Sequence, residues 1–111
     1  MLNVIKTSEE LTKKELYKLT VAPKTALSEK EGENLTVAKW AIYQRENSEG
    51  ETIETLAIID DEGKVFATSS QACINSFNEM NDMLEGDFSV ITVLRRTSKQ
   101  NRDYFVVTLV D

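Results

Sequence analysis

Residues 55–84 read TLAIIDDEGKVFATSSQACINSFNEMNDML, and they predict a strand, a tight turn, a second strand and a helix in direct succession. Residues 52–60 and 64–68 are rich in apolar and β-branched side chains, which is typical of strands. The Asp-Glu-Gly sequence at 61–63 predicts the turn between them. Ser69 or Ser70 can cap a helix that runs to about Leu84, with apolar residues three or four positions apart. This region therefore predicts two paired strands followed by a packed helix.

Three further strands are predicted on either side of this region. Residues 34–45 form a long strand whose apolar alternation slips near Lys39 and Trp40, and such a slip indicates a bulge that bends the strand. Residues 88–96 and 104–110 form two more strands, joined by a polar connection at 97–103. The sequence thus predicts a mainly β fold, a five-stranded OB-like barrel with one helix between strands 3 and 4. An α+β sheet with one packed helix would give the same order of elements.

Residues 1–30 are treated as an N-terminal extension of the single domain predicted for residues 1–111. Thr7-Ser8-Glu9-Glu10 and Thr12-Lys13-Lys14-Glu15 both have the pattern of a helix capping box. A short helix over 13–19 and a strand over 15–21 fit the sequence about equally well. Either element would end at Pro23.

The composition excludes several classes of site. The chain has 111 residues, a net charge of −6, one cysteine and no histidine. An intramolecular disulfide, a histidine zinc site and a serine–histidine triad are therefore impossible. Cys73 is predicted to be a small apolar core residue, and the carboxylates at 60–62 are predicted to belong to a β-turn. We expect no catalytic residues, no metal, no cofactor and no enzymatic activity. We also expect no signal peptide and no membrane span, and therefore a cytoplasmic protein.

Basic residues gather near the end of the chain. Residues 88–111 contain four basic and two acidic side chains, whereas the other 87 residues contain nine basic and 17 acidic ones. In an OB barrel the connection between the last two strands flanks the nucleic-acid groove, where cations neutralise phosphates and aromatic rings stack on bases. The candidate nucleic-acid-binding residues are Lys39, Trp40, Tyr43, Arg45, Phe66, Arg95, Arg96, Lys99, Arg102 and Tyr104. The alternative interpretations are a charged hairpin tip that keeps a sheet edge soluble and, for Trp40 and Phe66, burial in the core.

Three segments in register resemble a known family. Residues 31–37 join an acidic glycine turn to a long strand, residues 55–69 contain the pattern D-x-G-x-x-[YF]-[AS] before the helix, and residues 97–105 begin with Thr-Ser-Lys. Together they resemble the small single-stranded DNA-binding proteins of tailed phages that infect Gram-positive bacteria. The resemblance covers residues 31–110, and the stretch before it matches poorly.

The resemblance implies an OB-like fold and sequence-tolerant coating of single-stranded DNA during phage replication in the host cytoplasm, without catalysis. Its expected partners are single-stranded DNA, phage replication proteins and further copies of the chain, and it assigns binding to the connection around Lys99 and to Tyr104. The alternative is a small acidic phage protein that binds and modulates a host protein. A net charge of −8 over residues 1–87 favours that alternative.

Overall fold

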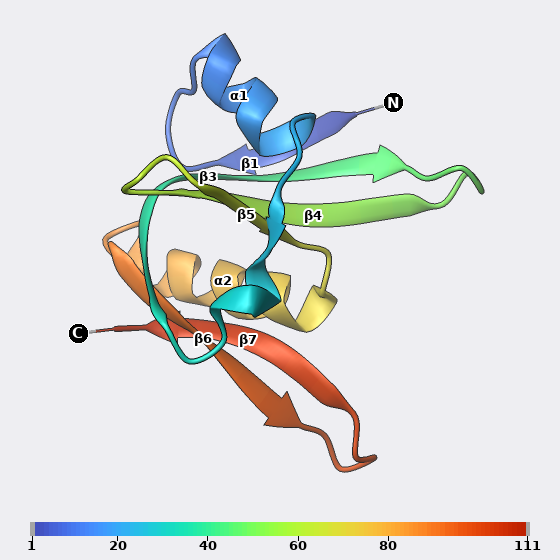
Figure 1. The fold of residues 1–111 in the computed structure, drawn as a ribbon, viewed down its shortest axis with the longest axis vertical. Helices are drawn as coiled ribbons and strands as arrows, with labels where there is room; N and C mark the ends of the chain where they lie inside the picture. The colour runs from blue at the N-terminus through green and yellow to red at the C-terminus, as the bar shows by residue number, and fades with distance from the viewer. Residues whose placement is uncertain (1, 111) are drawn as a thin grey trace.

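The fold, taken from a computed structural model that describes residues 2–110, is mainly β (Figure 1). One curled mixed sheet carries two α-helices and a short 3-10 helix. The strands are β1 (Asn3–Thr7), β2 (Thr25–Ala26), β3 (Asn34–Glu46), β4 (Thr52–Asp60), β5 (Val65–Thr68), β6 (Val90–Thr97) and β7 (Asp103–Leu109). The helices are α1 (Lys13–Thr20), η1 (Leu27–Lys30) and α2 (Gln71–Leu84).

The long strand β3 makes the sheet curl. Its first residues, 34–36, pair with β6, whereas residues 37–46 pair with β4. The register shifts between Val37 and Lys39, so the bulge expected near Lys39 and Trp40 is present. The strand order is β2-β5-β4-β3-β6-β7, and β1 pairs with β3 beside this path. Only the short β2–β5 pairing is parallel among the strand pairs of residues 2–110.

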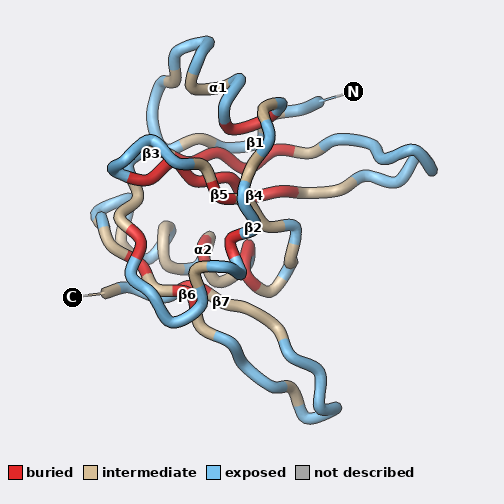
Figure 2. Tube along the Cα trace, viewed as in Figure 1, coloured by how far each residue is buried: buried red, intermediate tan, exposed pale blue. Residues whose placement is uncertain are grey.

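Buried side chains form two groups, one on each face of the sheet. Figure 2 marks the buried residues in red along the chain. The inner core lies between the curled sheet and α2. There the Phe77 ring packs edge-on against Trp40, with ring centroids 4.9 Å apart, and against Phe88 at 5.7 Å. The outer core lies under α1, where Leu19 packs with Tyr43 and its neighbours on β3 and β4. Both faces of these two strands are therefore covered.

The turn and helix predicted from residues 55–84 are confirmed. Asp60 Oδ1 accepts hydrogen bonds from the backbone N–H groups of Glu62 and Lys64, which closes the β-turn. Ser70 caps α2, and its Oγ accepts the backbone N–H of Cys73. The helix α2 ends in two left-handed residues, because Glu85 and Gly86 have positive φ values of 52° and 79°.

The number of elements differs from the prediction: among residues 2–110 there are seven strands and two α-helices instead of five and one. The additional strands and helix come from the N-terminal extension. Residues 13–20 are helical, and the Thr12 capping box forms because the Thr12 hydroxyl and the Glu15 carboxylate each accept the other residue's backbone N–H. The box predicted at Thr7 is wrong, because Thr7 ends β1 and its hydroxyl donates to the carbonyl of Glu9.

The ion pair between Glu15 and Lys39 joins α1 to the sheet, and it makes the stability of the folded protein depend on pH. Lys39 Nζ lies 2.5 Å from Glu15 Oε2, and this hydrogen bond, followed by that of the Thr12 backbone, lowers the pKa of Glu15 below its ordinary value of 4.5. A carboxylate whose pKa is lower in the folded chain than in the unfolded chain stabilises the fold at pH values above its unfolded pKa. This contribution is lost as pH falls through its folded pKa. We therefore expect Glu15→Gln to lower the melting temperature at neutral pH, and we expect the difference from the wild type to disappear once pH has fallen below the folded pKa of Glu15.

Thermal unfolding followed by circular dichroism across this pH range measures the difference between the two proteins. Glu10→Gln is the control, because no ion pair is formed by Glu10 within residues 2–110. A melting-temperature deficit of Glu15→Gln that stays constant down to the lowest pH would contradict the assignment.

Candidate nucleic-acid interface

The β6–β7 hairpin projects from the sheet at one end of the molecule's longest axis (Figure 1). In its register Arg96 lies directly opposite Tyr104. Both point away from the face that carries the core residues Val93 and Val107, because side chains alternate along a strand. Lys99 and Arg102 lie in the turn that joins the two strands, and Arg102 is two residues before Tyr104. We call Arg96, Lys99, Arg102 and Tyr104 the hairpin face.

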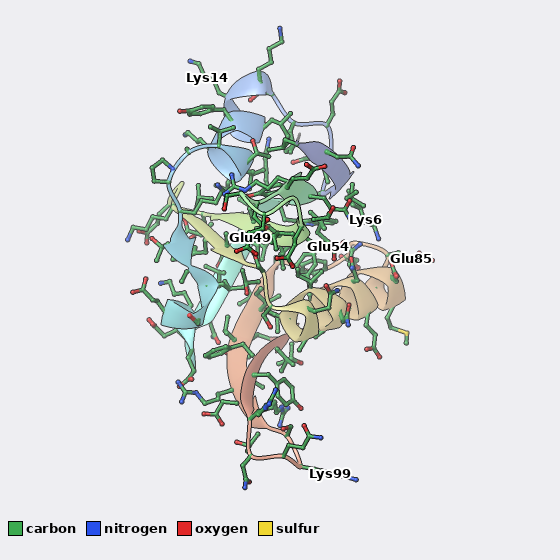
Figure 3. All side chains as sticks on the ribbon, turned by 90° about the vertical axis from the view of Figure 1, so that its right-hand side faces the viewer. Lys6, Lys14, Glu49, Glu54, Glu85 and Lys99 are labelled. Carbon is green, nitrogen blue, oxygen red and sulfur yellow. The ribbon has the colours of Figure 1, made fainter. Side chains whose placement is uncertain are left out.

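The tip of this hairpin is a hydrogen-bonded turn. The Ser98 N–H donates to the Arg102 carbonyl at 2.9 Å, and Ser98 Oγ accepts the N–H groups of Gln100 and Arg102. Asn101 adopts a left-handed φ of 61°, a conformation that asparagine tolerates better than most residues. This turn displays Lys99 at the far end of the hairpin (Figure 3).

Arg95 is the predicted hairpin cation that does not belong to this face. Its Nε donates to Glu31 Oε1 at 2.6 Å, and its Nη1 lies 3.4 Å from Asp103 Oδ2. Its guanidinium also lies over the Phe105 ring, 5.5 Å from the ring centroid. By contrast, no carboxylate of residues 2–110 lies within ion-pair distance of Arg96, Lys99 or Arg102. These three charges are available to phosphates, and that of Arg95 is already neutralised.

Three of the predicted stacking residues are buried, which corrects their assignment to the interface. Trp40, Phe66 and Tyr43 are 5%, 4% and 2% exposed. Trp40 and Phe66 belong to the inner core, where Trp40 contacts Phe77. Tyr43 lies in the outer core beneath α1, and its hydroxyl donates to the carbonyl of Thr20 at 3.3 Å. Among the predicted stacking residues, Tyr104 alone is not buried: it is half-buried on the hairpin.

The two predicted cations of β3 do not join the hairpin face either. Lys39 is paired with Glu15 and lies 3.7 Å from Glu9, so its charge is neutralised under α1. Arg45 is exposed near the end of β3, where it lines a hollow of about 330 Å³ together with Lys24. Burial, followed by the charge of Arg45, lowers the pKa of Lys24.

One exposed aromatic residue was missed in the sequence. Tyr17 is 57% exposed on α1, among Lys13, Lys14 and Lys18. Helical spacing brings these four residues to one surface, whereas a strand would distribute them over two faces. The spacing of these four residues was present in the sequence. It did not indicate a shared surface, because a helix and a strand fitted this region about equally well.

Cys73 is a core residue, as predicted. Its side chain is fully buried, and burial raises the pKa of the thiol from 9.0 to about 11. Because the thiolate is the reactive species, this shift alone makes the folded protein react about 100-fold more slowly with a thiol reagent at neutral pH. We expect the rate to return to that of a free cysteine when urea unfolds the chain. Fast labelling of the folded protein would contradict the burial of Cys73.

Three further observations bear on the identity of the protein, and none of them identifies it. Among residues 2–110 no group of three or more histidine, cysteine, aspartate or glutamate side chains is placed to hold a metal ion. None of the helices in that range combines the length and apolar character that crossing a membrane requires. Comparisons with protein-family models, with curated proteins and with solved structures find no match to this chain.

Proposed function

We propose that this protein binds single-stranded DNA with little sequence preference, and that the hairpin face is the contact. The observation that carries the proposal is the group of unpaired cations around Tyr104. The chain has 19 acidic residues, yet Arg96, Lys99 and Arg102 have no carboxylate partner in the described chain. A protein of net charge −6 that keeps three neighbouring cations unpaired has a local surface suited to an anion.

The chemistry of the hairpin face fits a flexible single strand. Guanidinium and ammonium groups attract phosphates without reading the bases, and a tyrosine ring offers a stacking surface to any base. Arg96 and Tyr104 are cross-strand neighbours, so a phosphate on one and a base on the other would belong to adjoining parts of the same strand. Such contacts are tolerant of sequence.

We further propose that β3–β7 and α2 form an open OB barrel. The order of these elements, the bent first strand that pairs with both β4 and β6, and the helix between β5 and β6 all support this assignment. In that fold the β6–β7 connection flanks the binding groove. The resemblance of residues 31–110 to phage single-strand binders supports a role in phage DNA replication in the host cytoplasm.

The direct test is the anisotropy of labelled oligo(dT) titrated with the protein at several salt concentrations. We expect micromolar binding at about 50 mM salt, and log Kd should change with log salt by about 0.7 for each neutralised phosphate, or about 2 for three cations. Oligo(dA) and mixed sequences should bind within about 10-fold of oligo(dT). An external label is needed because Trp40 is buried and cannot stack on a base. No binding at low salt would overturn the proposal.

A second candidate is a small phage protein that modulates a host protein, and one apolar groove favours it. Met80, Met83 and Leu109 line a hollow of about 350 Å³ between α2 and β7, and Met83 is 78% exposed. Exposed methionines adapt to protein partners. Retention of one host protein from nuclease-treated lysate, abolished by Met83→Glu, would favour this candidate over DNA binding.

A further inference from the structure

Basic residues also gather at the N-terminal side of the molecule, around α1. Three adjoining hollows there are lined by seven of the chain's 13 basic residues, and none of their lining residues within the described chain is acidic. Two of the hollows, of about 490 and 590 Å³, share Lys18 and Ala22. We call the lysines and the tyrosine that line these two hollows the lysine surface: Lys13, Lys14, Tyr17, Lys18, Lys30 and Lys64.

Three separate segments supply the residues of the lysine surface. Helix α1 supplies Lys13, Lys14 and Lys18, η1 supplies Lys30, and the turn before β5 supplies Lys64. Strand β2 pairs with β5, and the two strands contribute Thr25, Val65 and Phe66 to the lining of the larger hollow. This convergence exists only in the folded chain, because the lysines are spread over residues 13–64.

The charges of the lysine surface are mostly unpaired. Within residues 2–110 the only ion pair in the group joins Lys64 to Glu62 at 3.6 Å, and both side chains are about two-thirds exposed, so solvent weakens it. Glu15, the acidic residue of α1, instead faces Lys39. Lys30 Nζ lies 5.2 Å from the Phe66 ring centroid, a contact that leaves its charge available. The outward side of α1 therefore carries lysine charges that no carboxylate of residues 2–110 neutralises.

Tyr17 gives this surface a second chemical property. Tyr17 is 57% exposed, although tyrosine is usually more buried, and lysines flank it along α1. A cationic hollow with an exposed ring is the combination with which proteins bind single strands. The hollows are open and extended, which suits a chain of phosphates better than one enclosed small molecule.

We propose that the lysine surface is a second contact for single-stranded DNA, with lysines on phosphates and Tyr17 stacked on a base. The ligand class rests on the proposed function, but the surface is separate from the hairpin face. Lys14 and Lys99 lie at opposite ends of the molecule (Figure 3), whose largest extent is 38 Å. A strand that contacts both Lys14 and Lys99 must span most of the protein. Affinity therefore increases with oligonucleotide length, because the second contact is intramolecular.

Two variants of the full chain test this inference: Lys13→Gln/Lys14→Gln/Lys18→Gln, and Tyr17→Ala. With oligo(dT) of about 20 nucleotides at about 50 mM salt, the first is expected to bind more weakly by about 100-fold or more, with a salt slope shallower by about 2, and the second roughly 5-fold more weakly. The ratio of affinities for about 20 and about 6 nucleotides should fall towards one in the lysine variant. Tyr17→Phe, which keeps the ring, should bind as the wild type does.

Lys6→Gln is the matched control, because Lys6 lies on β1, pairs with Asp82 and belongs to neither surface. Circular dichroism melting verifies that each variant is folded. Wild-type affinity, salt slope and length dependence in both α1 variants would overturn the second contact and leave the proposed function intact. If the α1 variants lose binding while hairpin variants keep it, the lysine surface stands and the hairpin assignment falls. If the wild type binds no oligonucleotide, both fall.

Discussion

Changing Arg96 and Arg102 to glutamine and Tyr104 to alanine in one protein is expected to weaken binding to oligo(dT) by about 100-fold or more at about 50 mM salt. The loss of two phosphate contacts reduces the slope of log Kd against log salt by about 1.4. At about 50 mM salt this corresponds to an affinity that is lower by tens of fold. The lost ring removes about 1–3 kcal/mol of stacking, a further factor of five or more. Anisotropy titrations at four or more salt concentrations give both the affinity and the slope.

Two control variants accompany this triple variant, one on the hairpin and one elsewhere. Tyr104→Phe keeps the ring and should retain nearly all affinity. Arg95→Gln is unsuitable as a neutral control, because Arg95 holds Glu31 and Asp103 and its loss leaves both carboxylates unpaired. Lys6→Gln serves instead, since it removes one exposed charge elsewhere. The assignment of the hairpin face is wrong if the triple variant stays folded and binds with wild-type affinity and slope.

The parts of the fold that were predictable are those encoded by neighbouring residues. Asp60 to Gly63 determine their turn through side-chain-to-backbone hydrogen bonds, and Ser70 determines where α2 begins. The bend of β3 was visible because a bulge interrupts the alternation of apolar residues. The strands contributed by the N-terminal extension were not predictable, because β2 has two residues and depends on pairing with β5.

The candidate site was less predictable because burial depends on distant parts of the chain. Tyr43 would lie on an open face of the sheet if α1 were absent, and α1 covers it through Leu19. The curl of β3 turns Trp40 towards Phe77, and periodicity within the strand cannot indicate which face is inside. The hairpin cations were identified because they are close in sequence. The lysine surface was not, because its lysines alternate with glutamates along the chain and separate from them only in the fold.

Phe77→Ala is expected to lower the free energy of unfolding by about 3–5 kcal/mol, a large part of the roughly 5–15 kcal/mol that small domains possess. Phe77 is fully buried and contacts Trp40 of β3 and Phe88 of the segment before β6, so its ring joins α2 to both halves of the curled sheet. Truncation leaves a cavity at this junction, and both edge-on aromatic contacts are lost.

Urea unfolding followed through Trp40 fluorescence measures this loss, because Trp40 lies beside the cavity and moves into water when the chain unfolds. The midpoint should fall while the slope stays near that of the wild type, since the surface exposed on unfolding is almost unchanged. Phe77→Leu, which fills most of the space, should cost clearly less. A cost below about 1 kcal/mol for Phe77→Ala would mean that α2 does not pack inside the curl as described. The hairpin face would then lack the support that holds β7 in place, because Ser76 of α2 accepts the backbone N–H of Val107 at 2.9 Å.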